Sequence, residues 1–158
     1  MKYLKYLVLL CGLCMIWSCG GDDDICESGE GTPRLRVGFK SASTGKILPL
    51  ENIYVAVDYG SGKVDLGRQQ NVESILVPLR VDDNPYTDIY VKLEEKGKES
   101  QVRISYTTKA TYVSPGCGAK KSYENLNTEL SVADPVKGTE VEQNQIENED
   151  KTGIYLIF

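Results

Sequence analysis

The chain has 158 residues, which is enough for one domain of ordinary size. It carries 18 Lys and Arg, 23 Asp and Glu and no His, for a formal net charge of −5. The lack of His excludes Ser-His-Asp and Cys-His catalysis and imidazole metal sites. The acidic balance lacks the basic footprint of a nucleic-acid binder, so no nucleic-acid partner is expected.

The N-terminus has the features of a secretory signal. Lys2 and Lys5 precede the almost wholly apolar segment Leu7–Trp17. This segment is too short to span a bilayer, which needs about 20 helical residues, but it fits the apolar region of a signal peptide.

The sequence Ile16-Trp17-Ser18-Cys19 resembles the lipobox of bacterial lipoproteins. The resemblance implies a signal peptide over residues 1–18 and lipidation of Cys19, so that the membrane is the first partner. An ordinary signal peptide cut nearby is the alternative.

An acidic tether follows over residues 19–25. Its triplet Asp22, Asp23 and Asp24 resembles the surface-export signal of Bacteroidota lipoproteins, which implies an outer-membrane anchor and exposure on the cell surface. The alternative is a solvated, extended tether at the periplasmic face.

Two cysteines remain after the signal and the lipidated residue, namely Cys26 and Cys117. An even remainder in an oxidising compartment predicts one disulfide. Closing a loop of roughly 90 residues contributes about 4–5 kcal/mol on the chain-entropy model. A redox-active or nucleophilic Cys is disfavoured, because the chain has no C-x-x-C motif and no His base.

Residues 26–158 are typical of an all-β domain. Apolar residues recur with a period of two, which predicts strands, and the run containing Pro78 is expected at an edge or a strand end. The predicted strands are Leu35–Phe39, Ile53–Tyr59, Ile75–Leu79, Ile89–Leu93, Val102–Tyr112 and Ile154–Phe158. Val102–Tyr112 is expected at the centre of a sheet, and the last strand between two neighbours.

Two segments are less regular. Residues 123–132 keep no clear parity, and one short helical turn is predicted over residues 125–131. Residues 140–151 are polar and predict either a short strand with an exposed turn or a loose loop. Turn signals include Gly60-Ser61-Gly62 and Asp82-Asp83-Asn84-Pro85. The pattern predicts a single antiparallel, Ig-like β-sandwich of about seven or eight strands.

Cys26 before Thr32-Pro33-Arg34, followed later by Ser114-Pro115-Gly116-Cys117-Gly118, resembles a family of small uncharacterised Bacteroidota lipoproteins. Its members carry a Cys before a T-P-R strand start and a later S-x-x-C-G segment. The family is a domain of unknown function, so it implies lineage and location but no activity. Its two cysteines agree with the predicted disulfide.

Candidate chemical sites are few. Gly60-Ser61-Gly62-Lys63 is weakly similar to a phosphate loop, but the spacing favours a hairpin turn. Four residues offer oxygen ligands for Ca²⁺ without EF-hand spacing, and turn roles explain them better. They are Asp82, Asp83, Asn84 and Asp88. No metal and no cofactor is therefore predicted.

Carboxylates in clusters raise the possibility of glycoside hydrolysis, which requires two acids facing each other across a cleft. The clusters are Glu94 with Glu95, and Glu147, Glu149 and Asp150. All are typical of solvated charge, and the chain is not expected to be an enzyme.

Two further groups of side chains suggest binding. Tyr54, Tyr90, Tyr106 and Tyr112 are either core residues or a stacking platform for sugar. Arg34 and Arg36 with Lys120 and Lys121 form a basic patch if Cys26 and Cys117 are bonded, or else scattered solubilising charge.

The sequence thus predicts a cell-envelope lipoprotein with a non-catalytic binding or structural role in an outer-membrane or surface assembly. The alternative is a small-ligand or glycan-binding module. The expected partners are the membrane and an envelope protein or a glycan.

Overall fold

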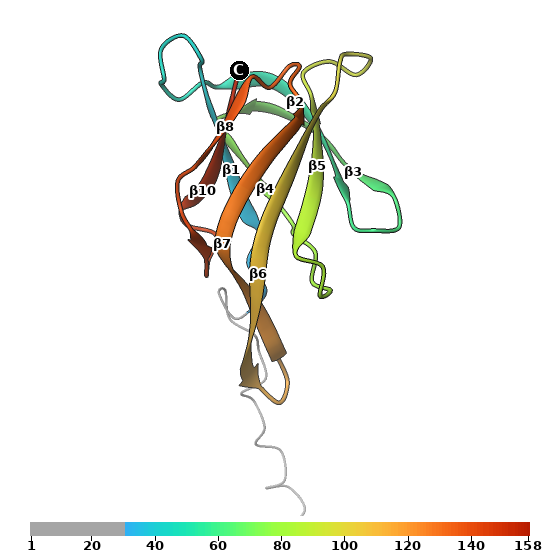
Figure 1. The fold of residues 1–158 in the computed structure, drawn as a ribbon, viewed down its shortest axis with the longest axis vertical. Helices are drawn as coiled ribbons and strands as arrows, with labels where there is room; N and C mark the ends of the chain where they lie inside the picture. The colour runs from blue at the N-terminus through green and yellow to red at the C-terminus, as the bar shows by residue number, and fades with distance from the viewer. Residues whose placement is uncertain (1–30) are drawn as a thin grey trace, which may run out of the picture.

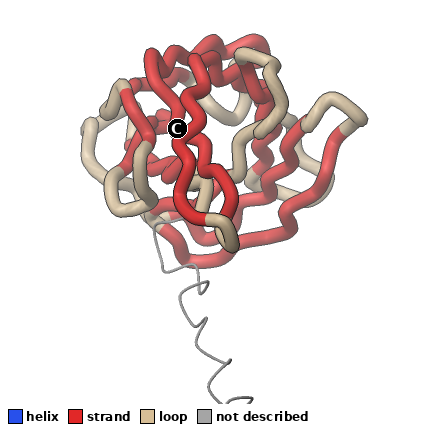
Figure 2. Tube along the Cα trace, turned by 90° about the horizontal axis from the view of Figure 1, so that it is seen from below, coloured by secondary structure: helices blue, strands red, loops and turns tan. Residues whose placement is uncertain are grey.

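The computed structural model describes residues 31–158, which form two packed β-sheets (Figure 1). The described residues contain ten strands. They are β1 (Leu35–Lys40), β2 (Leu50–Asp58), β3 (Lys63–Val72), β4 (Ser74–Val77), β5 (Tyr86–Lys92), β6 (Ser100–Ser114), β7 (Gly118–Val132), β8 (Gly138–Val141), β9 (Gln145–Ile146) and β10 (Thr152–Ile157). The view along the long axis shows strands around the interior, joined by loops (Figure 2).

The strand order is β4-β1-β10-β8 in the smaller sheet and β3-β2-β5-β6-β7-β9 in the larger one. All pairs are antiparallel except β1 and β10, which run parallel. The predicted all-β sandwich is therefore confirmed, with ten strands in place of seven or eight and with one parallel pair.

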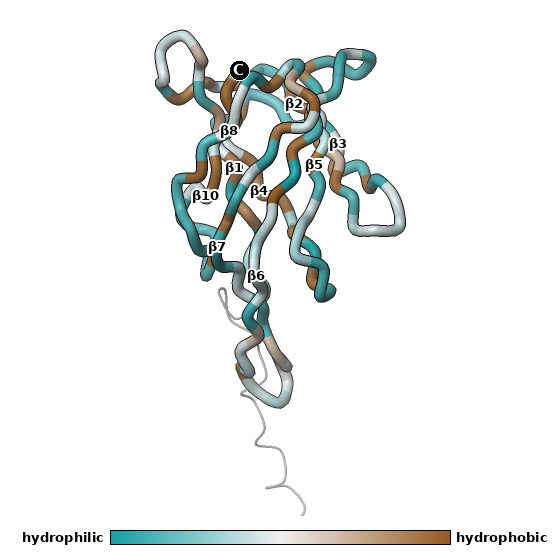
Figure 3. Tube along the Cα trace, viewed as in Figure 1, coloured by the Kyte–Doolittle hydropathy of each residue, from teal (hydrophilic) through white to brown (hydrophobic). Residues whose placement is uncertain are grey.

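The core lies between the sheets and is built from the inward-facing positions of each strand. Val37, Ile89 and Leu156 are fully buried examples from β1, β5 and β10. Each such side chain contributes about 1.5–3 kcal/mol through removal of apolar surface from water. The hydropathy colouring shows apolar segments on the strands of both sheets (Figure 3).

The C-terminal strand lies where its sequence indicates. β10 lies between β1 and β8, and its Ile154 and Leu156 are fully buried. Likewise, β6 lies in the interior of the larger sheet, and its residues include the whole predicted strand Val102–Tyr112. The predicted strand over residues 75–79 is β4, an edge strand that ends just before Pro78.

Strand β3 was not expected from the sequence. It is an edge strand with mostly exposed side chains, so few apolar residues mark it. Gly67 in β3 has φ +84°, which favours glycine, and the register with β2 shifts at this point. The predicted turn over residues 60–62 is confirmed as the β2–β3 connection, where Gly60 and Gly62 also have positive φ.

The helical turn predicted over residues 125–131 is wrong, because β7 runs through this segment. Asn125 adopts φ +57°, and the register with β6 shifts beside it, as in a β-bulge. The bulge lets both Tyr123 and Leu126 face the core, which breaks the period-two pattern. Of the alternatives for residues 140–151, the short strands β8 and β9 with turns are found.

Strands β6 and β7 form a long hairpin that extends beyond the sandwich, at the end opposite the C-terminus (Figure 1). Its tip lies between Ser114 and Gly118, and Tyr112 near the tip is 67% exposed. Among residues 31–158, no helix is long and apolar enough to cross a membrane.

Candidate binding face and the sites predicted from sequence

The outer face of the larger sheet carries an aromatic and charged surface. Along β2, Val55 and Val57 point into the core, so Tyr54 and Ala56 point outward. Along β5, Ile89 and Val91 point inward, so Tyr90 and Lys92 point outward. Strand pairing places Tyr54 opposite Lys92 and Ala56 opposite Tyr90.

These positions enclose a hollow of about 500 Å³, called here the Tyr54–Tyr90 hollow. Ala56 lies between the two tyrosines on the sheet, and its small side chain leaves the space. Apart from Val55, the remaining lining is charged and comes from the two strands beside β2 and from the loop after β5. It consists of three cations (Lys63, Arg68, Lys92) and three carboxylates (Asp65, Glu95, Glu99).

Several of these groups hold one another in place. The Lys63 ammonium lies 3.5 Å from the ring centroid of Tyr90 and forms an ion pair with Glu99. Burial and the nearby Asp88 carboxylate raise the pKa of Tyr90 above its ordinary value. Arg68 donates to Asn52 Oδ1 at 2.8 Å, and Lys92 donates to the backbone carbonyl of Glu95 at 3.2 Å.

Next to the hollow, Asp88 and Arg103 form a bidentate ion pair. Both hydrogen bonds measure 2.8 Å, and Asp88 is only 7% exposed. The hydrogen bond to Asp88 raises the pKa of the Arg103 guanidinium. The Arg103 guanidinium carbon also lies 4.1 Å from the ring centroid of Tyr86. This ion pair is a polar group on the outer face of β5 and β6, at one side of the hollow.

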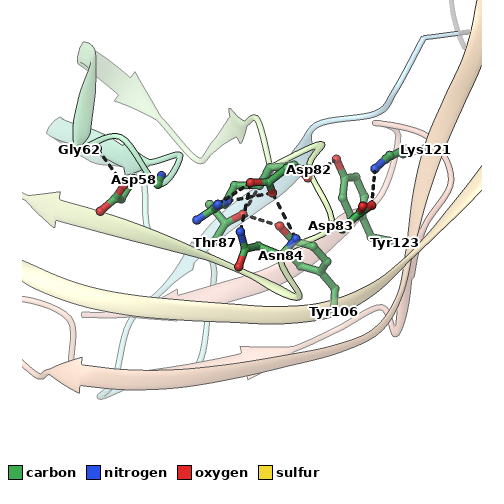
Figure 4. A network of polar contacts seen from close by, with 11 residues as sticks. Asp58, Gly62, Asp82, Asp83, Asn84, Thr87, Tyr106, Lys121 and Tyr123 are labelled. Carbon is green, nitrogen blue, oxygen red and sulfur yellow. Dashed lines mark hydrogen bonds and ion pairs between the residues drawn. The ribbon is translucent and has the colours of Figure 1, made fainter.

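The predicted calcium ligands do not converge. Asp82 accepts hydrogen bonds from Arg80, which hold the pKa of the Asp82 carboxyl well below its usual range. Asp83 lies 3.6 Å from the Lys121 ammonium (Figure 4). Asp88 pairs with Arg103. The three carboxylates therefore form ion pairs with three different cations. Within residues 31–158, no group of three or more potential metal ligands is brought together.

The four tyrosines of the predicted platform separate. Tyr106 is buried, and its ring meets that of Tyr123 edge to face at a centroid distance of 4.9 Å. Its hydroxyl lies 2.6 Å from Thr87 Oγ1, and burial raises the pKa of Tyr106. Tyr112 lies on the hairpin, so only Tyr54 and Tyr90 share the hollow.

The predicted basic patch is largely neutralised. Arg34 donates two side-chain hydrogen bonds to Glu149, of 2.8 and 2.7 Å, which lower the pKa of Glu149 to about 2. Arg36 donates to the backbone carbonyl of Glu149 and to Ser74. Lys120 and Lys121 also have interactions, the latter with Asp83.

The residues of the predicted carboxylate clusters lie in different surroundings. Glu149 is committed to Arg34, while Glu147 is exposed and Glu95 lines the hollow. Lys63 opens strand β3, so no helix follows the glycine turn as a phosphate loop requires.

Several predicted residues lie outside the described part of the chain. They are Cys19, Asp22, Asp23, Asp24 and Cys26. Cys117 is disulfide-bonded, and it is the only Cys within residues 31–158, so its partner also lies outside them. The pairing with Cys26 stays a prediction.

Sequence reasoning singled out Tyr54 and Tyr90, and Lys63 only as part of a turn weakly similar to a phosphate loop, but it missed Ala56, Lys92 and Arg68. The alternation of the predicted strands could have found Ala56 and Lys92, because both occupy positions that point away from the core. No signal placed Lys63 and Arg68 on this sheet face, because β3 itself was not expected.

The chain belongs to a family of unknown function, DUF6452, whose pattern it matches over residues 52–158. The match covers the larger sheet except for the first two residues of β2, includes both tyrosines of the hollow, and extends through the C-terminal strand. No curated protein and no solved structure matches the chain.

Proposed function

We propose that this protein is a cell-envelope lipoprotein that acts by binding, as a non-catalytic component of an outer-membrane or surface assembly. Its signal peptide is residues 1–18, Cys19 carries the lipid, and residues 19–25 are the acidic tether. The lipobox Ile16-Trp17-Ser18-Cys19 and the Asp22–Asp24 triplet support this proposal and a Bacteroidota origin.

The observation that carries the proposal is the place where the chain enters the sandwich, at Thr32. Thr32 accepts a hydrogen bond of 3.0 Å from the backbone N–H of Lys121 on β7. The described chain therefore starts beside the hairpin, at the end of the sandwich opposite the C-terminus (Figure 1).

A Cys26–Cys117 bond brings the anchor to the same end. Cys26 lies seven positions after Cys19, and an extended chain covers at most about 25 Å over that length. The hairpin tip then faces the membrane, and the outer face of the larger sheet stands clear of it.

The pairing of the acidic side chains favours binding over catalysis. Asp82, Asp88 and Glu149 each form an ion pair with an arginine. Hydrogen bonds from arginine lower the pKa of Asp82 and of Glu149, so these two carboxylates stay charged near neutral pH and are poor proton donors. An envelope protein is the partner proposed first. A small ligand or glycan is the second candidate, and the Tyr54–Tyr90 hollow favours it.

Fractionation of cells that express Cys19→Ala tests the proposal. The wild-type protein is expected in the membrane fraction, and the variant is expected to leave it. Cys14→Ala is the matched control, since Cys14 also lies in the signal region, and it should fractionate like wild type. Unchanged membrane association of Cys19→Ala would contradict the proposed anchor.

A further inference from the structure

We infer that the Tyr54–Tyr90 hollow binds a neutral saccharide. The inference deepens the proposed function, because it rests on the sandwich being a binding domain and names the class of ligand. Three features support it, namely the uncovered ring of Tyr54, the equal numbers of positive and negative side chains around the hollow, and the volume of the hollow.

Tyr54 is the ring available for stacking. Lys63 already covers the ring of Tyr90 at 3.5 Å, whereas no cation is found over the ring of Tyr54 in the described part of the chain. Tyr54 stands on β2 between Arg68 on one neighbouring strand and Lys92 on the other. An aromatic face offers the apolar C–H face of a sugar ring a flat, hydrophobic surface.

Ala56 sets the space beside this ring. A sugar that stacks on Tyr54 enters the hollow over the methyl group of Ala56, opposite Tyr90. The volume of about 500 Å³ falls within the range of small-ligand sites.

The charged lining favours a ligand that is polar but uncharged. Three cations and three carboxylates surround the hollow, so the formal charges cancel. An anionic ligand would meet Asp65, Glu95 and Glu99, and a cationic ligand would meet the three basic residues. Hydroxyl groups both donate and accept hydrogen bonds, and therefore suit a lining of both signs.

The remaining hydrogen-bonding capacity supports the same ligand. Lys92 uses one of its three N–H donors on the Glu95 carbonyl, and Arg68 has two of its nitrogens on Asn52. Both side chains therefore keep donors that can reach sugar hydroxyls on either side of Tyr54.

The test is a titration of the mature full chain in detergent, followed by NMR of the backbone amides. The probes are neutral mono- and trisaccharides of glucose, galactose, mannose and N-acetylglucosamine, with glucuronic acid and glucosamine as charged counterparts. We expect a neutral probe to shift the amides of Tyr54, Ala56 and Tyr90, and to bind more tightly than its charged counterparts.

Two variants and one control localise the binding. Tyr54→Ala is expected to weaken binding about tenfold, the equivalent of about 1.4 kcal/mol. Ala56→Leu is expected to abolish it by filling the hollow. Tyr112→Ala removes an exposed tyrosine outside the hollow and should bind like wild type.

Three results would overturn the inference. They are an absence of shifts at the hollow with every neutral probe, tighter binding of a charged counterpart, and binding that neither Tyr54→Ala nor Ala56→Leu weakens. The titration needs no membrane, so its failure is distinct from a failure of the Cys19 anchor.

Discussion

Thr32 Oγ1 accepts a 3.0 Å hydrogen bond from the backbone N–H of Lys121, a residue 89 positions later in the chain. This contact joins the entry of the domain to the base of the projecting hairpin. The disulfide at Cys117 lies only four residues before Lys121 on the same hairpin. If Cys117 pairs with Cys26 as predicted, the disulfide adds a second link that holds the start of the chain at the end of the sandwich where the anchor is proposed.

Thr32→Val should destabilise the domain by about 1 kcal/mol, because it leaves the N–H of Lys121 without its acceptor. Thr32→Ser keeps the hydroxyl and is the matched control. Hydrogen exchange of the Lys121 amide and urea unfolding measure the effect. Equal protection of this amide in Thr32→Val and wild type would argue against the link.

Cys26 and Cys117 should resist alkylation in the unfolded, unreduced protein and react after reduction. Cys26→Ser is expected to lower the free energy of unfolding by about 4–5 kcal/mol, since the unfolded chain loses its constraint. Cys117→Ser and the double variant should match it, because each removes the same bond. Alkylation of Cys26 without reduction would rule out the pairing.

Glu149 should make stability depend on pH in the acidic range. Its pKa is about 2 in the folded protein against 4.5 ordinarily, because Arg34 donates hydrogen bonds to it. The stabilisation is thus complete above pH 4.5 and is lost as the pH falls towards 2. It amounts to about 1 kcal/mol, since solvent screens this partly exposed pair.

Glu149→Gln should flatten the dependence of urea unfolding on pH in that window. Glu147→Gln, which changes an exposed neighbour, should leave it as in wild type. An unaltered acid response in Glu149→Gln would show that other groups cause it.

Asn125 should be replaceable by Gly but not by Val. Its φ of +57° lies in the left-handed region, where a β-branched residue is strained by about 1–2 kcal/mol. Thermal unfolding of Asn125→Val should show a lower midpoint, and that of Asn125→Gly one near wild type. Equal midpoints for the two variants would contradict the bulge.

The fold follows from the sequence wherever a strand has one buried face. The alternation in β1, β2, β5 and β6 marks these strands directly. It fails for β3, most of whose side chains are exposed, and for β7, where the Asn125 bulge shifts the parity.

The site is harder to predict than the fold, because it depends on pairing between strands. Local sequence shows that Tyr54 and Tyr90 are aromatic residues on strands. It does not show that β2 lies beside β5. This pairing of the two strands places Ala56 next to both tyrosines. Ion pairs such as Arg34 with Glu149 are equally invisible, since 115 positions separate the two residues.

Proteolysis of intact cells, with lysed cells as the control, tests the proposed surface exposure. Digestion on intact cells is expected if Asp22–Asp24 act as an export signal. Protection until lysis would place the domain in the periplasm and leave the triplet a tether.

The mass of the mature N-terminal peptide tests the lipoprotein account most directly. The account predicts that membrane-extracted protein begins at Cys19 and carries a thioether-linked diacylglycerol. A mature N-terminus at another residue, or an unmodified Cys19, would contradict it.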